Sequence, residues 1–154
     1  MKHLFNLLIC SSLFAGISFA QTAIPNTTAV TQNFDAMAAT TTLPSNWKMH
    51  ATTSSPNYST ASGSVTQFAT GGTPATGGTY NFGATTAERS VGAMTSSGFA
   101  SPNNLLGYFR NTNSNAITDL TIAYDAERFR INSAAASVQF FYSLNGSTWT
   151  AVTS

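Results

Sequence analysis

The sequence has few charged side chains and few of the residues that perform nucleophilic, acid–base or metal chemistry. Only 7% of its 154 residues are charged, and it contains one cysteine and two histidines. Cys10 and His3 both lie in the N-terminal stretch that we interpret below as a signal peptide. The rest of the chain then has no thiolate nucleophile, no disulfide and no thiolate metal site. His50 remains, and we interpret it as a strand residue because it is a lone histidine beside Trp47 and Met49. A Ser-His-Asp triad would have to use it, but no G-x-S-x-G nucleophile elbow is present.

The acidic residues are few and scattered. Of the five Asp and Glu side chains, Asp35, Asp119 and Asp125 are dispersed, and no D-x-D-x-D calcium loop is present. A glycosidase needs two carboxylates across a cleft, and the spacing of the acidic residues in this sequence does not favour such a pair. No G-x-x-x-x-G-K-[ST] phosphate loop occurs. The sequence therefore predicts a non-catalytic segment with no cofactor and no metal.

The N-terminal stretch MKHLFNLLICSSLFAGISFA has the pattern of a signal peptide. Lys2 precedes an apolar run, and Ser18 and Ala20 supply the small residues that precede a cleavage site. The alternatives are a membrane anchor and a lipoprotein. Serine and glycine interrupt the run before it reaches the ~20 apolar residues of a spanning helix, and bulky Ile9 precedes Cys10 where lipidation favours a small residue. We predict a signal peptide at 1–20, cleavage after Ala20, and no membrane segment afterwards.

The charge balance of the cleaved chain argues against nucleic acid. Removing Lys2 from the six Lys and Arg residues leaves five bases against five acids. Such a chain has no basic surface to displace counterions from phosphates. We therefore expect no nucleic-acid partner for this segment.

The rest of the chain is typical of β-strands separated by turns. Thr, Ser, Asn, Gly and Ala dominate, and no window shows the apolar periodicity of a helix. The clearest strand is ITDLTIAYD, residues 117–125, in which Leu120, Ile122 and Tyr124 share one face and the residues between them take the other. Further candidates are NWKMHAT, SVTQFAT, TYNFG and LLGYFRNT.

A hairpin is expected in SVQFFYSLNGSTWTAV, residues 137–152. Asn145-Gly146 is a favourable pair for a tight turn, and we expect Val138, Phe140 and Tyr142 to face inward. The pattern predicts an all-β fold, an antiparallel, jelly-roll-like β-sandwich at 33–154 after an N-terminal linker at 21–32. Because the sequence stops within the return strand, we expect the sandwich to be incomplete at its C-terminal end.

Aromatic side chains are the candidates for binding. Trp47 and Tyr58 are able to offer flat faces to sugar rings, and Tyr58 lies in the polar stretch SSPNYSTASGS. The alternative is that these aromatic residues fill the core of a small β-domain.

Arg89 and Glu127 are the candidates for a structural ion pair. Glu127 shares strand parity with Phe129 and Ile131, and this parity predicts that its carboxylate faces the core, where it needs a partner. Arg89 shares parity with Val91, and its guanidinium can bind a carboxylate through two parallel bonds. The alternative is that both are solvated surface charges.

Several motifs resemble an N-terminal β-sandwich module of secreted multidomain bacterial proteins of the Bacteroidota and Verrucomicrobia type. They span roughly residues 33–150 and are NFDAMAATTTLPSNWKM, TYNFG followed by Glu88, Arg89 and Gly92, the strand with Tyr124, Glu127, Phe129 and Arg130, and FFYSLNGSTWT. The resemblance implies no established activity for the module itself. It implies that other domains accompany the module, and secretion to the exterior or cell surface of a Gram-negative bacterium.

Two classes of function remain open. The first is a non-catalytic module of an extracellular or cell-surface protein that attaches, spaces or binds glycans or cell-surface components. The second is an accessory domain of a secreted hydrolase, such as an endonuclease or phosphatase, whose catalytic domain lies beyond residue 154.

Overall fold

A computed structural model describes residues 21–25, 28–52, 54–68, 74–85, 87–99, 102–131 and 137–152. The predicted signal peptide at 1–20 lies outside these residues, so cleavage after Ala20 stays a prediction. Within the described residues, strands predominate and the helical structure is a single 3₁₀ turn, which confirms the all-β prediction. The elements are β1 (Thr22–Ile24), η1 (Asp35–Met37), β2 (Trp47–Ala51), β3 (Gln67–Phe68), β4 (Gly78–Thr85), β5 (Glu88–Met94), β6 (Asn103–Gly107), β7 (Phe109–Asn111), β8 (Phe141–Tyr142) and β9 (Thr150–Ala151).

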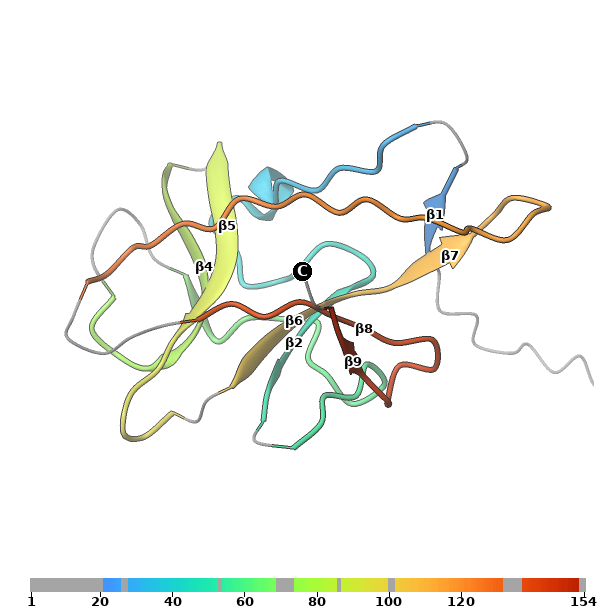
Figure 1. Cartoon of the computed structure of the whole chain (residues 1–154). Helices are drawn as coiled ribbons and strands as arrows, with labels where there is room; N and C mark the ends of the chain where they lie inside the picture. Colours follow the sequence, from blue (N-terminus) through green and yellow to red (C-terminus); the bar gives the residue numbers. More distant parts are fainter. Residues whose placement is uncertain are drawn as a thin grey trace, which may run out of the picture.

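The strands form four small sheets (Figure 1). The sheet β3-β4-β5 has three strands, and β1-β7, β2-β6 and β8-β9 have two each. The pairs β2-β6, β4-β5 and β8-β9 are antiparallel, whereas β1-β7 and β3-β4 are parallel. β1 lies inside the segment 21–32 that the sequence predicts as a linker, and it pairs with β7.

β4 is the most deeply buried strand, because every residue from Gly78 to Gly83 is buried. Its pairing with β5 shifts register between Phe82 and Thr85, which marks a bulge. Gly83 has a φ of 142°, and a Cβ there would collide with the carbonyl oxygen of Glu88. The TYNFG motif therefore ends in a glycine because the bulge brings the β5 backbone against it.

The core lies between η1 and the strands β2 and β5. Its buried residues are Met37, Leu43, Met49 and Val65, and the half-buried Phe34, Trp47 and Val91 pack against them. The Trp47 ring meets Phe34 edge-on at a centroid distance of 5.1 Å and Phe109 at 5.9 Å. These edge-to-face contacts fix the indole at the border of the core.

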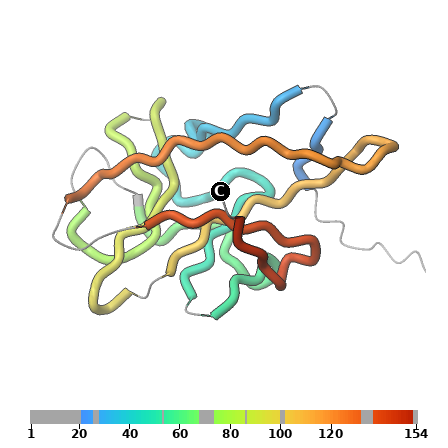
Figure 2. The backbone as a smooth tube through the Cα atoms, viewed as in Figure 1, coloured from blue at the N-terminus to red at the C-terminus, as the bar shows by residue number. Residues whose placement is uncertain are grey.

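Residues 117–125 do not form the strand that the sequence predicts. They have no strand assignment, and Leu120, Ile122 and Tyr124 are 58%, 49% and 59% exposed. The face that these three side chains share is therefore exposed, and the strand prediction is wrong. The tube in Figure 2 shows this segment running as an extended chain across the molecule. Alternation makes the segment suitable for a strand, but a strand also needs a neighbour to complete its hydrogen bonds.

The hairpin at Asn145-Gly146 is confirmed. Gly146 has a φ of 75°, and β8 pairs with β9 on either side of the turn. The expected inward orientation is wrong for Val138 and Tyr142, which are 70% and 50% exposed. The reason is that the hairpin contacts the rest of the protein through its turn and through Trp149, as described below.

Candidate ligand-binding site

The loop at 54–60 folds back over β2 and carries Tyr58. Lys48 on β2 donates from Nζ to the carbonyl oxygen of Tyr58 at 2.9 Å. His50, two residues along the same strand, accepts from the backbone N–H of Asn57 at its Nδ1, at 3.0 Å. Asn57 in turn accepts from the backbone N–H of Ser59 at 2.9 Å, an Asx-turn that closes the loop. Two side chains on one face of β2 therefore hold the loop in place.

Tyr58 meets Tyr108 across this loop. The two ring centroids are 4.6 Å apart, with an interplanar angle of 36°. Lys48 Nζ lies 4.5 Å from the centroid of the Tyr58 ring, within the range of a cation–π interaction. Tyr108 lies between β6 and β7, and its backbone N–H donates to the carbonyl of Asn46 at 2.9 Å. We call Lys48, Tyr58 and Tyr108 the tyrosine cluster.

The hairpin of β8 and β9 closes one side of the tyrosine cluster. The backbone N–H of Tyr58 donates to the carbonyl oxygen of Gly146 at 3.1 Å. The indole N–H of Trp149 donates to the carbonyl oxygen of Pro56. Gly146 also approaches the Tyr58 side chain, because a Cβ at Gly146 would lie 3.7 Å from the Tyr58 Cβ. The hairpin thus braces the loop that presents Tyr58.

The electrostatics of the cluster keep Tyr58 protonated. Burial raises the pKa of the Tyr58 phenol, and the neighbouring Tyr108 raises it further. A protonated phenol is both a hydrogen-bond donor and an acceptor. Among the described residues, no group hydrogen-bonds to the hydroxyl of Tyr58 or Tyr108. Both hydroxyls are therefore available to a ligand.

The two aromatic residues singled out by sequence have different environments. Trp47 and Lys48 are neighbours in β2, so their side chains point to opposite faces of the strand. Trp47 packs at the border of the core between Phe34 and Phe109, as the alternative interpretation expected. Tyr58 lies in the tyrosine cluster, half-buried and outside the core.

Sequence reasoning did not single out Lys48 or place Tyr108 next to Tyr58. The two tyrosines are far apart in the sequence and meet only because the loop folds over the β2-β6 sheet. The one signal available was that Lys48 is a rare charge next to Trp47. His50 is a residue of β2, as expected from the sequence.

The structure places Arg89 and Glu127 in different environments. Arg89 is 5% exposed, and its Nη1 donates to the carbonyl oxygen of Gly83 at 3.3 Å. Glu127 is exposed, and its Oε2 accepts from the Ser90 hydroxyl at 3.0 Å. The expectation that Glu127 faces the core is therefore wrong, because its segment lies over β5 and does not pair into a sheet. The ion pair between Arg89 and Glu127 stays a prediction.

Asp35 and Asn81 connect the N-terminal loop to the β4-β5 pair. Asp35 accepts at Oδ1 from the backbone N–H of Arg89 at 2.8 Å. Asn81, with no exposed surface, donates from Nδ2 to the carbonyl oxygens of Ala38 and Thr40 at 2.9 and 2.8 Å. These contacts are structural and leave the tyrosine cluster as the candidate site.

No metal cluster or membrane-spanning helix is present in the part of the chain that the structure describes. No three His, Cys, Asp or Glu side chains there form a group able to hold a metal ion. No helix there is long and apolar enough to cross a membrane. Comparison with protein-family models, curated proteins and solved structures finds no match for this chain.

Proposed function

We propose that this chain is an exported, non-catalytic β-sandwich module of a larger extracellular or cell-surface protein, and that it binds glycans at the tyrosine cluster. The observation that carries the proposal is the pair of Tyr58 and Tyr108, with rings 4.6 Å apart and both hydroxyls without a partner among the described residues. Because this pair lies outside the core, its two hydroxyl groups can form hydrogen bonds with a ligand.

The chemistry of the cluster favours a sugar as the ligand. Phenol rings combine an apolar body with a polar tip, and this matches the alternating apolar and hydroxyl surfaces of a sugar ring. Lys48 contributes a positive charge next to the Tyr58 ring. A neutral or weakly acidic glycan therefore fits better than a cationic ligand.

The proposed sandwich is supported by the antiparallel pairs β2-β6 and β4-β5 on either side of the core. Export rests on the signal-peptide pattern, with cleavage after Ala20. A secreted module encounters cell-surface or extracellular polysaccharides, and a tyrosine site of this kind would bind them.

The test is a glycan array with the cleaved protein, followed by calorimetric titration of the sugars that bind. Tyr58→Phe and Tyr108→Phe remove the hydroxyls and keep the rings. Each lost hydrogen bond is worth about 0.5–1.5 kcal/mol, so the affinity should fall by about 2–10-fold. Tyr142→Phe is the matched control, because Tyr142 is 50% exposed and lies outside the cluster.

Binding that weakens in the two cluster variants and persists in Tyr142→Phe supports the proposal. The proposal is wrong if no glycan binds at about millimolar concentration, or if all three variants bind as the wild type does. Because the hydroxyls have no partner in the described protein, the Phe variants should also unfold at the wild-type temperature. This separates lost binding from lost structure.

A further inference from the structure

The main chain of residues 117–125 has no partner in a sheet. Within the described residues, none of these backbone N–H and C=O groups pairs with another backbone group, and no strand includes them. The segment is extended and alternates apolar residues with Thr, Ala and Asp. An extended chain with a row of unpaired N–H and C=O groups is a template for a further strand.

The residues that follow hold this segment against the protein. Glu127 accepts from Ser90 on β5 at 3.0 Å, and Arg130 Nη1 donates to the carbonyl oxygen of Pro74 at 2.9 Å. The Phe129 ring stacks on Phe82 of β4 with centroids 4.5 Å apart and planes 6° from parallel. Residues 117–125 are therefore presented by an anchored chain.

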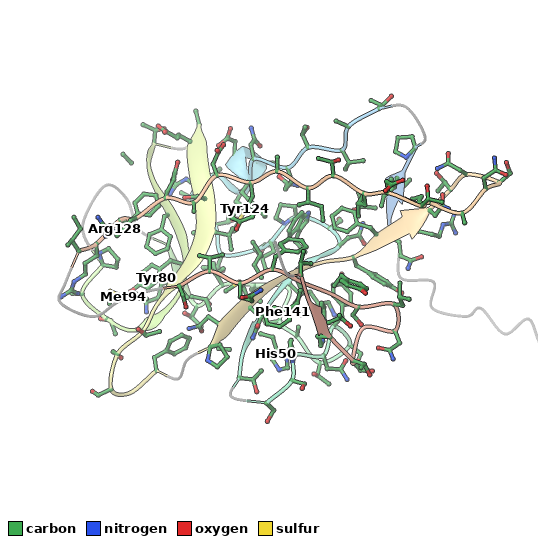
Figure 3. The ribbon with its side chains drawn as sticks, in the orientation of Figure 1. His50, Tyr80, Met94, Tyr124, Arg128 and Phe141 are labelled. Atoms are coloured by element: carbon green, nitrogen blue, oxygen red, sulfur yellow. The ribbon has the colours of Figure 1, made fainter. Side chains whose placement is uncertain are left out.

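The segment lies beside a second stretch of chain that also exposes apolar side chains. Tyr124 stacks on Phe140 with centroids 6.3 Å apart, which brings the segment beside the stretch that leads into β8. Figure 3 shows Tyr124 on this segment and Phe141 on β8, with His50 on β2. Together the two stretches expose five large apolar side chains, which we call the front apolar surface: Leu120, Ile122, Tyr124, Val138 and Tyr142.

The front apolar surface has the area of a functional patch. Its side chains are between 49% and 70% exposed. At about 150 Å² per large side chain, the five side chains expose roughly 400–500 Å², which lies within the roughly 300–600 Å² of the largest apolar patch on a typical monomer, a patch that is often functional. A standard interface buries about 800 Å² per partner. The side chains alone supply more than half of that, before the unpaired backbone is counted.

We propose that two copies of this chain associate through residues 117–125, paired as antiparallel strands. A second copy supplies the same unpaired main chain and the same apolar surface, so one two-fold contact satisfies both. The cleaved chain has five basic and five acidic residues, so net charge does not oppose the contact. Because the segment itself carries Asp119 and Asp125 and no base, the antiparallel register must be one that does not place these two carboxylates opposite each other. This surface does not include the tyrosine cluster, so the inference is independent of the proposed function.

The experiment compares two double variants at the same positions. Consecutive residues of a strand point their N–H groups to opposite edges, so Thr121→Pro with Ile122→Pro removes one donor from each edge. Neither N–H has a backbone partner among the described residues of the monomer, so the monomer should keep its fold. Thr121→Val with Ile122→Val keeps both donors and is the matched control.

Sedimentation velocity over about 1–100 µM should show dimers for the wild type and the valine variant. The proline variant should dissociate at least about tenfold more readily. Hydrogen exchange on the wild type provides a second measurement, since the amides of 117–125 should gain protection as concentration rises. The proposal would be overturned if the wild type stays monomeric, or if the proline variant dimerises as tightly as the wild type. It would also be overturned if the exchange rates of the amides of 117–125 do not change with concentration.

Discussion

Replacing Asn81 is the perturbation with the clearest expected effect on stability. Its Nδ2 donates to the carbonyl oxygens of Ala38 and Thr40, which follow η1, and the side chain has no exposed surface. The amide thus ties the N-terminal loop to the central strand β4. Asn81→Ala removes both donors and leaves two acceptors behind.

The magnitude follows from the surroundings of the two carbonyls. Ala38 is half-buried, so the loss of its donor costs about 1–3 kcal/mol, while Thr40 is exposed and regains water at a cost nearer 0.5–1 kcal/mol. Asn81 Oδ1 has no partner in the described residues, so removing it recovers about 1 kcal/mol. The net expectation is a loss of roughly 0.5–3 kcal/mol in the free energy of unfolding.

Asn81→Asp tests the same contact by replacing the amide donor with a carboxylate. An ionised carboxylate has no donor and faces two carbonyl oxygens, so we expect a larger loss near neutral pH than for Asn81→Ala. Burial raises the pKa of the new carboxyl above its unfolded value. Stability that is present in acid is therefore lost as the pH rises through the folded pKa.

Urea unfolding followed by circular dichroism measures all these differences. Asn111→Ala is a suitable control, because Asn111 is exposed and its side-chain hydrogen bonds are open to water. Its Nδ2 donates to the carbonyl of Asn115 at 2.8 Å, and its Oδ1 accepts from the backbone and side-chain N–H groups of Asn113, each at 2.9 Å. It should change the free energy of unfolding by less than about 0.5 kcal/mol. An Asn81→Ala variant as stable as the control, or an Asn81→Asp variant no less stable at neutral pH than in acid, would refute the reasoning.

Three further predictions concern the bulge, the ion pair and the tyrosine cluster. Gly83→Ala should lower the free energy of unfolding by at least about 2 kcal/mol, because its Cβ would collide with the Glu88 carbonyl; a thermal melt close to that of the wild type would contradict this. A double-mutant cycle on Arg89→Ala and Glu127→Gln should give a coupling energy below about 1 kcal/mol, because Glu127 is exposed; a coupling of several kcal/mol would instead show a buried pair. Tyr58 should ionise above its ordinary pKa of 10.0, so its contribution to stability should be lost as the pH rises past that value, and Tyr58→Phe should remove this step from an absorbance titration.

Local patterns were sufficient to predict several elements. Asn145-Gly146 predicts the hairpin, because the turn itself requires a positive φ and Gly146 adopts it. The stretches around Trp47 and Tyr80 predict β2 and β4, since each alternates polar and apolar residues between turn signals. These elements are determined by residues that are close together in the sequence, so the sequence alone is enough to predict them.

Contacts between distant segments were not predictable in the same way. Residues 117–125 have the alternation of a strand, but whether they pair depends on a neighbour that alternation does not specify. Tyr58 and Tyr108 meet because a loop folds over β2, and the sequence of the loop does not indicate which residue it will contact. Glu127 contacts Ser90 of β5 and remains exposed, because its segment crosses the sheet and does not join it.

The most direct test of the proposed function is the position of a bound sugar on the protein. The measurement is the change in tyrosine ring resonances when a glycan identified on the array is titrated into the cleaved, isotope-labelled protein. The account predicts shifts at Tyr58 and Tyr108, whose rings lie together, and none at the exposed Tyr124 and Tyr142. Shifts confined to Tyr124 and Tyr142, or no shift at any tyrosine at saturating sugar, would contradict it.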